Sequence, residues 1–246
     1  MKYLRKFNSL TDYNNFKKSS NYITPNVCLI EYNKQKVYKF NDSKYNGYTY
    51  VDLGLPSGTL WAEYNVGANS PEEYGLLFAW GDTVGYTADD IYNGRNEFFW
   101  NDYIFSNDLG VRKYCTDTAY GAIDNKTVLD LEDDAAHVHM GGEWHMPTKA
   151  QIKELTDNTI SEWTTFNGIY GRVFASKING NTLFVPAAGY GSEGAFRNAG
   201  RYGRIWSSSL NVDDSTQATY WNFYDEYVSI DNGTRACGRS IRGVIG

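Results

Sequence analysis

The chain's three histidines, His137, His139 and His145, lie within a span of nine residues. A His-x-His pair followed by a third histidine has a spacing that can bind zinc. These histidines flank a Gly-Gly pair and a tryptophan, however, and the acidic residues before them are accounted for by the preference for negative charge at a helix N-terminus. We therefore expect the imidazoles to make structural hydrogen bonds, and we predict no metal site and no cofactor.

A second group of candidate residues lies in the C-terminal part of the chain, where aromatic residues alternate with Arg, Asn and Asp. Aromatic rings give contact area at low entropic cost, and Arg and Asn supply hydrogen bonds. If residues 220–227 form a strand, one of its faces is predicted to be core and the other, with the Gly-rich segment 189–203, to bind a ligand. The predicted ligand-binding residues are Arg197, Asn198, Arg201, Tyr202, Asn222, Tyr224, Asp225 and Tyr227.

Catalytic chemistry has less support in the sequence. No histidine follows His145 and no GxSxG motif is present, so a nucleophile, a base and an orienting partner cannot be assembled by spacing. The acidic pairs Asp133-Asp134 and Asp213-Asp214 are adjacent in sequence, which suits loops or helix starts better than the paired carboxylates of a glycosidase. We predict no catalytic residues and no enzyme activity.

Two helices are predicted to position the histidines. Residues 128–138 combine apolar residues with four acids, and the Gly-Gly pair that follows is a suitable helix stop. Thr148 is a good N-cap with Gln151 in the capping-box position, so a second helix is expected to begin there. Ile152 and Leu155 would form its apolar face.

The remaining elements are predicted to be strands and loops. Asn-Gly pairs at 167–168 and 179–180 separate apolar runs, which is a strong hairpin signal. Residues 83–127 show little periodicity and are predicted to be a long irregular insertion. Strands are predicted over residues 51–53, 60–62, 74–80, 163–166, 171–176, 182–186, 205–209, 218–224 and 239–244, with hairpin turns near 213–214 and 231–233.

Composition limits the classes of function. The 246-residue chain has a formal net charge of −6, which argues against nucleic-acid backbone binding as its main role. Aromatic residues make up 16% of the chain, and 24 of its residues are glycine. This composition is typical of loop-rich folds that display or bury many aromatic rings, as carbohydrate and protein binders often do. Five tryptophans in apolar surroundings are predicted to be core residues: Trp61, Trp80, Trp144, Trp163 and Trp206.

Cysteine spacing and hydropathy bear on the protein's environment. Cys28, Cys115 and Cys237 lie far apart, so there is no metal-binding CxxC motif and free thiols are predicted. The first residues lack the apolar run of a signal peptide, and no segment approaches the length of a membrane span. We expect a protein that stays inside the cell that makes it or leaves by a route that needs no signal.

Residues 1–47 are predicted to form a separate N-terminal arm, because they are rich in Asn, Lys, Tyr and Ser and contain no Trp. A short helix is expected over residues 10–18, and a small hairpin over residues 27–32 and 36–40. An isolated hairpin is marginally stable in water, so it should pack on the main domain, residues 48–246, or on another chain. The arm is therefore a candidate for attachment or oligomerisation.

Six sequence blocks resemble a known family in content and order: GLPSGTLWAEYNVGA, YGLLFAWGD, DDAAHVHMGGEWHMPTKAQIKEL, NGNTLFVPAAGY, YGRIWSSSL and GRSIRGV. The chain resembles the Fibrobacter succinogenes major paralogous domain family over roughly residues 48–246. The resemblance implies an α+β, C-type-lectin-like fold with two helices, small twisted antiparallel sheets and long loops. His139 and His145 depart from the family pattern, which has Asn and Arg there.

A resemblance to lectin-like proteins raises two activities that the residues do not favour. Calcium-dependent sugar binding needs clustered carboxylate and amide oxygens. The chain has neither Glu-Pro-Asn nor Gln-Pro-Asp, and Trp221-Asn222-Phe223 only partly matches the Trp-Asn-Asp element, although the acid-rich loops leave a calcium ion open as an alternative. Formylglycine-generating enzymes need a pair of active-site cysteines near the C-terminal end, and only Cys237 lies there.

The resemblance also implies a setting and partners. Members of the family are plentiful in gut Bacteroidetes and their phages, and the arm resembles the leading segment of Bacteroides phage structural proteins, which reach the outside by lysis. We therefore predict a non-enzymatic virion accessory protein, such as a head or tail fibre or decoration protein. Its arm would bind other virion proteins and its main domain a host-surface glycan or protein, in a homo-oligomer with a trimer favoured. The alternatives are an adhesin domain on a bacterial cell surface and a purely architectural capsid cement.

Overall fold

The computed structural model describes residues 30–32, 35–37 and 43–246, and this part of the chain is mostly β. Strand makes up 37% of the structure and helix 13%, arranged as several antiparallel sheets. The predicted α+β, C-type-lectin-like fold is therefore wrong, because short helices accompany the sheets and no helix-plus-sheet lectin arrangement is formed. None of the described helices has the length and hydrophobicity needed to cross a bilayer.

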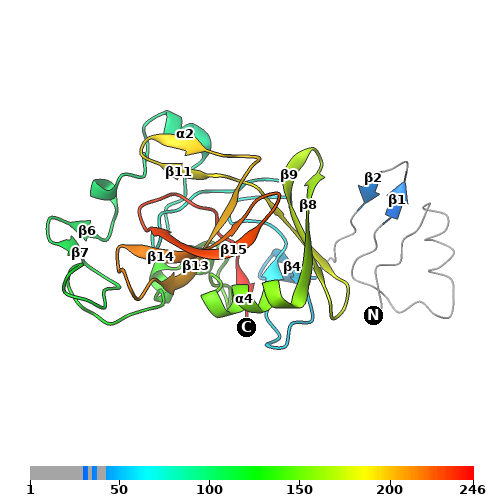
Figure 1. The fold of residues 1–246 in the computed structure, drawn as a ribbon, viewed down its shortest axis with the longest axis horizontal. Helices are drawn as coiled ribbons and strands as arrows, with labels where there is room; N and C mark the ends of the chain where they lie inside the picture. Colours follow the sequence, from blue (N-terminus) through cyan, green and yellow to red (C-terminus); the bar gives the residue numbers. More distant parts are fainter. Residues whose placement is uncertain (1–29, 33–34, 38–42) are drawn as a thin grey trace.

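Three larger sheets form the body of the domain. The first has the order β10–β9–β8, the second β13–β14–β15, and the third β16–β5–β4–β3. Figure 1 shows the β13–β14–β15 sheet with helix α4 below it and the β8–β9 hairpin beside it. The strands of these sheets are β3 (Lys44–Tyr45), β4 (Tyr48–Asp52), β5 (Leu60–Ala62), β8 (Thr159–Phe166), β9 (Ile169–Ser176), β10 (Thr182–Pro186), β13 (Gly203–Leu210), β14 (Gln217–Phe223), β15 (Val228–Thr234) and β16 (Val244–Ile245).

Three two-stranded hairpins complete the strands. They are β1 (Ile30–Tyr32) with β2 (Gln35–Val37), β6 (Ser106–Asn107) with β7 (Gly110–Val111), and β11 (Tyr190–Ser192) with β12 (Ala195–Arg197). The first pair confirms the hairpin predicted in the arm, whereas the helix predicted over residues 10–18 lies outside the described residues. Because β3 pairs with β4, Lys44 and Tyr45 lie in the same sheet as the strand that begins at Tyr48.

Helix α4 (Lys149–Asn158) forms as predicted. The side chain of Thr148 accepts the Gln151 N–H, and the Gln151 side chain in turn accepts the Thr148 N–H, which is a complete capping box. Ile152 and Leu155 are fully buried against the core. Local capping chemistry thus determined where this helix begins.

The helix predicted over residues 128–138 is shorter than expected. A 3₁₀ turn, η2 (Leu131–Asp133), precedes helix α3 (Ala135–Met140). The reason is Asp134, whose carboxylate caps the helix by accepting the His137 N–H and also accepts the Met146 N–H across the turn. Gly141, with φ of 67°, ends the helix as predicted.

Residues 83–127 are irregular as predicted, and among them lie only short elements. They are α2 (Ala88–Tyr92), the 3₁₀ turn η1 (Trp100–Asp102), β6 and β7. The strand predicted over residues 74–80 is reduced to single bridges at Leu77 and Phe78. The turn predicted near 231–233 is wrong: these residues lie inside β15, and the chain turns at 224–227 instead.

Tryptophans form the centres of the hydrophobic core. Trp80, Trp144 and Trp206 lie in one cluster, and Trp61 packs edge-on against Trp221 in another. These rings are fully buried, which confirms four of the five predicted core tryptophans. Trp163 is the exception and is only half-buried.

A buried arginine ties the C-terminal segment to this core. Arg242 is fully buried and donates to the carbonyl oxygens of Ala62, Glu63 and Phe184. Its Nε donates to Asn65 Oδ1 at 2.9 Å. Burial lowers the pKa of Arg242 to about 9, which still leaves it protonated at neutral pH.

We predict that Arg242→Met lowers the free energy of unfolding by about 3 kcal/mol or more, because several buried acceptors lose their donor at once. Urea denaturation measures the difference. Arg95→Met is the matched control, since the Arg95 side chain is 72% exposed, and its effect should stay within about 0.5 kcal/mol. Equal stability of the two variants would contradict the role given to Arg242.

Candidate functional site

The β8–β9 hairpin carries one wall of the candidate site. Its Asn167-Gly168 turn has φ of 48° and 83°, as the predicted hairpin requires. This turn sets the register, so that Trp163 lies opposite Arg172. The rings of Trp163 and Tyr170 stack nearly parallel on the same face, with 6.1 Å between centroids and 13° between planes.

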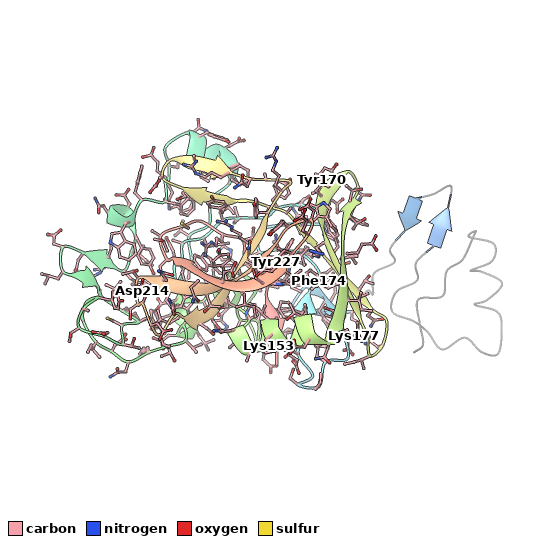
Figure 2. All side chains as sticks on the ribbon, viewed as in Figure 1. Lys153, Tyr170, Phe174, Lys177, Asp214 and Tyr227 are labelled. Carbon is pink, nitrogen blue, oxygen red and sulfur yellow. The ribbon has the colours of Figure 1, made fainter. Side chains whose placement is uncertain are left out.

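Arg172 joins this hairpin to the turn after β14. Its Nη1 donates to the carbonyl oxygens of Tyr224 at 2.7 Å and Tyr227 at 3.3 Å, and its Nε donates to Ser161 Oγ. Burial lowers the pKa of Arg172, while the negative charge of Asp225 opposes that shift. Figure 2 labels Tyr170 on the β8–β9 hairpin and Tyr227, the residue just before β15.

The Gly-rich segment supplies the second wall. Asn198 has φ of 59°, and its carbonyl oxygen accepts the N–H groups of Arg201 and Tyr202, each at 3.0 Å. Gly200 donates its N–H to the Ala187 carbonyl. This tight turn holds the Tyr202 ring against that of Tyr224, with 5.3 Å between centroids.

Together these segments enclose a cavity of about 360 Å³. Four aromatic rings and one pair of opposite charges face it, and the cavity's lining residues are Trp163, Tyr170, Gly200, Arg201, Tyr202, Tyr224 and Asp225. Ligand pockets of this size are commonly lined by rings with a few polar groups that orient the ligand. The arrangement can stack flat apolar faces and hydrogen-bond hydroxyl groups.

Of the eight predicted ligand-binding residues, four line this cavity and a fifth lies beside it. Arg201, Tyr202, Tyr224 and Asp225 line the cavity, and the Tyr227 ring adjoins that of Tyr224 at 5.6 Å. The other three do not line it.

Those three residues have other places in the structure. Asn222 is buried on β14 and donates to Asp231 Oδ2. Arg197 is exposed at the end of β12, and Asn198 forms the turn.

Sequence reasoning missed Trp163, Tyr170 and Arg172. The prediction that Trp163 belongs to the core is corrected, because its ring lines the cavity as well as packing against core residues. A signal was present: the Asn-Gly turn fixes the hairpin register, and that register places Trp163 and Tyr170 on one face. The sequence did not show which other segment of the chain lies against this face.

The histidines do not converge, which confirms the prediction of structural hydrogen bonds. His137 Nδ1 contacts the Trp144 carbonyl at 3.1 Å, and His139 Nε2 contacts the Thr83 carbonyl at 2.8 Å. His145 contacts carbonyl oxygens of its neighbour Met146 and of the C-terminal residue. Each imidazole therefore fixes a different segment of backbone.

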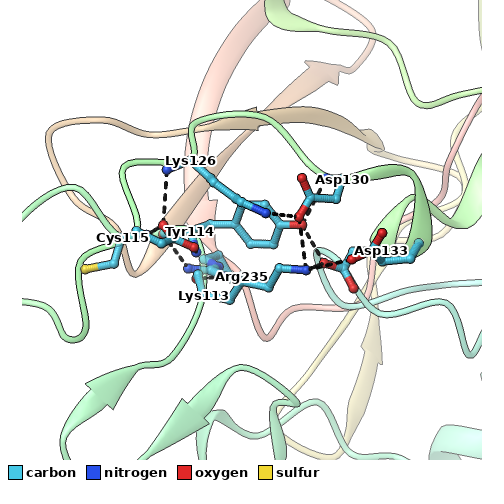
Figure 3. Close-up of polar contacts among 9 residues, drawn as sticks. Lys113, Tyr114, Cys115, Lys126, Asp130, Asp133 and Arg235 are labelled. Atoms are coloured by element: carbon cyan, nitrogen blue, oxygen red, sulfur yellow. Dashed lines mark hydrogen bonds and ion pairs between the residues drawn. The ribbon is translucent and has the colours of Figure 1, made fainter.

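One acidic cluster is found among the described residues, formed by Asp130, Glu132 and Asp133. The ammonium group of Lys113 lies among these carboxylates and pairs with all three, at 3.1 Å from Asp130. Figure 3 shows its contacts with Asp130 and Asp133. Tyr114 Oη also donates to Asp133. The Lys113 ammonium thus already occupies the position among these carboxylates where a metal cation would bind.

A second cavity, of about 430 Å³, lies between η1 and the residues near Cys237. Phe99 and Trp100 contribute rings, and Asp102 and Glu193 contribute carboxylates. Cys115 and Cys237 are both free thiols, as predicted, and Cys28 lies outside the described residues. No cationic side chain lines this cavity, so it lacks the combination of a cation and a carboxylate that lines the first.

Comparison with known proteins identifies no relative: no family model, no curated protein and no solved structure matches the chain. The family resemblance of the sequence blocks stays a prediction. The geometry of the described residues is therefore the basis for interpreting the site.

The acidic cluster generates a prediction about pH. The hydrogen bond from Lys126, assisted by Lys113, holds the pKa of Asp130 below its ordinary value. A lowered folded-state pKa stabilises the fold above the unfolded-state pKa of about 3.9, and this contribution is lost as pH falls through the folded-state pKa. Asp130→Asn should therefore be less stable than the native chain at pH 7, and the difference should shrink below about pH 4.

Urea denaturation at pH 7 and pH 3 measures this difference. Asp157→Asn is the control, because it removes an exposed ion pair with Lys153 on α4 and should change stability little at either pH. A difference between Asp130→Asn and the native chain that is as large at pH 3 as at pH 7 would contradict the assignment.

Proposed function

We propose that the chain is a non-enzymatic binding protein that takes a glycan into the cavity between the β8–β9 hairpin and the Gly-rich turn. The observation that carries this proposal is the pairing of two aromatic walls, Trp163 with Tyr170 and Tyr202 with Tyr224. A sugar ring has C–H faces that pack on aromatic rings and hydroxyl groups at its edge. Arg201 can donate to those hydroxyls and Asp225 can accept from them.

The setting of the rings supports recognition of a small extended ligand. They form a concave site of about 360 Å³ rather than a flat patch. Arg172 fixes the turn that carries Tyr224, so that part of the site is preorganised by a buried cation. Preorganisation favours binding because less conformational freedom is lost when the ligand arrives.

The wider assignment stays a prediction from the sequence. It comprises a virion accessory protein, an arm docked to other virion proteins and a trimer. A bacterial-surface adhesin domain and an architectural capsid cement are its alternatives. The cement differs from the other assignments because it needs no ligand. Glycan binding at the cavity would favour the virion fibre or the adhesin over the cement.

The test is binding of the full chain to an immobilised panel of neutral, carboxylated and sulfated oligosaccharides, followed by solution affinities for the glycans retained. We expect Trp163→Ala to weaken binding by at least about tenfold, since truncating a central aromatic contact commonly costs 2 kcal/mol or more. Intrinsic fluorescence should report the same event, because Trp163 lines the cavity.

Ile160→Ala is the matched control for this test. Ile160 lies on the same strand, is 66% exposed and, three residues from Trp163, points to the opposite face. It should bind like the native chain. Unchanged binding by a folded Trp163→Ala variant would exclude this cavity, and retention of no glycan by the native chain would count against the proposed function.

A further inference from the structure

Buried arginines in this protein follow a pattern. Arg235 donates to the Tyr103 hydroxyl and to carbonyl oxygens of Lys113, Tyr114 and Ser215. Arg242 and Arg172 are likewise bonded to backbone carbonyls, as described above. Such bonding is expected, because a buried charge without hydrogen-bond partners is costly.

Arg239 departs from this pattern. It is 3% exposed, yet its Nε and Nη1 atoms have no hydrogen-bond partner among the described residues. Its guanidinium lies against the rings of both Trp206 and Tyr220, 3.9 and 3.6 Å from their centroids, and these two rings are nearly perpendicular to each other. Burial lowers its pKa to about 10, so it stays protonated at neutral pH. A buried cation with unused donors calls for an acceptor that the chain does not supply.

Arg204 places a second cation beside the first. Its guanidinium carbon lies 3.9 Å from the Tyr190 ring centroid and 5.7 Å from the Tyr220 centroid, the ring that Arg239 also contacts. The Nε of Arg204 is also without a partner among the described residues. Its positive charge acts with burial to lower the pKa of Arg239. Arg204 is only half-buried, so solvent and ligands can reach it.

The polar groups on this face do not balance the two cations. Asp231 lies opposite Tyr220 on β15, but its carboxylate accepts from Asn222 Nδ2 and Ser229 Oγ, each at 2.9 Å. Within the described residues, no ion pair joins Asp231 to either arginine. The Asn222 Oδ1 atom is buried without a donor. Two guanidinium groups against one carboxylate leave this face with an excess of positive charge.

We propose that Arg204 and Arg239 bind an oxyanion, a carboxylate or sulfate group, carried by the glycan that occupies the neighbouring cavity. Arginine suits this task, since its planar fork bonds such groups in pairs. Tyr202 lies between the cavity and the arginine pair, because its ring lines the cavity and is 5.5 Å from the Arg204 guanidinium. The ligand class is thus an acidic glycan, an inference that rests on the proposed function.

The experiment compares matched pairs of glycans on the full chain. The probes are sialylated and desialylated lactosamine, sulfated and unsulfated lactosamine, and oligogalacturonate and its methyl ester. At least one acidic member should bind at least about tenfold more tightly than its neutral partner. Arg204→Gln should reduce that preference to about twofold or less. Arg95→Gln, at an exposed site, should change neither affinity.

Sulfate ion alone separates this inference from the proposed function. Sodium sulfate is titrated against sodium chloride of equal ionic strength, with thermal unfolding as the measurement. Sulfate should raise the Tm of the native chain and of Trp163→Ala by more than that of Arg204→Gln, for which only the general stabilising effect of sulfate remains. Arg204→Lys should keep part of the shift, because it retains the charge without the fork.

The outcomes distinguish the two proposals. Glycan binding that depends on Trp163 with no preference for acidic members overturns the oxyanion site and leaves the proposed function standing. Sulfate binding that depends on Arg204 with no glycan binding overturns the acidic-glycan assignment together with the proposed function. A preference for acidic glycans that survives Arg204→Gln also overturns the role of the arginine pair.

Discussion

Buried backbone carbonyls are the constraint on which the rest of this structure depends. Long irregular segments enter the core, and a carbonyl oxygen removed from water needs a donor. The C-terminal segment supplies donors through Arg235 and Arg242, which reach carbonyls more than a hundred residues away in sequence as well as nearer ones. A guanidinium has five N–H donors, so one arginine can donate hydrogen bonds to several irregular segments at once and hold them together. This explains how a domain with few helices holds its loops in fixed positions.

An arginine that donates to backbone carbonyl oxygens of a distant segment also holds the candidate site together. Arg172 extends from β9 to the turn after β14, so two hairpins that are far apart in sequence share one cation. Below this contact, Phe174 packs on Trp221 with 4.5 Å between centroids, which places a rigid core under the cavity. Three residues therefore follow one another along one face of β9: Phe174 is buried in the core, Arg172 is bonded to the turn, and Tyr170 is exposed. Rigid support of this kind is what positions the aromatic walls against each other.

Local signals in the sequence were sufficient where the structure is local. The Asn167-Gly168 turn and the Thr148 cap gave correct elements because their chemistry is contained within a few residues. The segment Asp231-Asn232-Gly233 has turn chemistry but lies in a strand, since Asp231 is bonded to Asn222 across the sheet. The fold class was wrong for a related reason. It came from a resemblance of short blocks, and such blocks do not determine how the sheets between them pair.

The candidate site was half predictable because composition reports on chemistry and not on distance. The aromatic and charged residues near Tyr224 could be recognised, whereas the wall carrying Trp163 depends on the long-range contact made by Arg172. The net charge of the chain was likewise a poor guide to the local charge on one face of the molecule. The chain is acidic overall, with a net charge of −6, yet Arg204 and Arg239 gather on one face beside a single carboxylate. At the short distances over which a ligand is recognised, nearby charges outweigh the screened total. An acidic protein can therefore present a local site for an anion, which is the role proposed for Arg204 and Arg239.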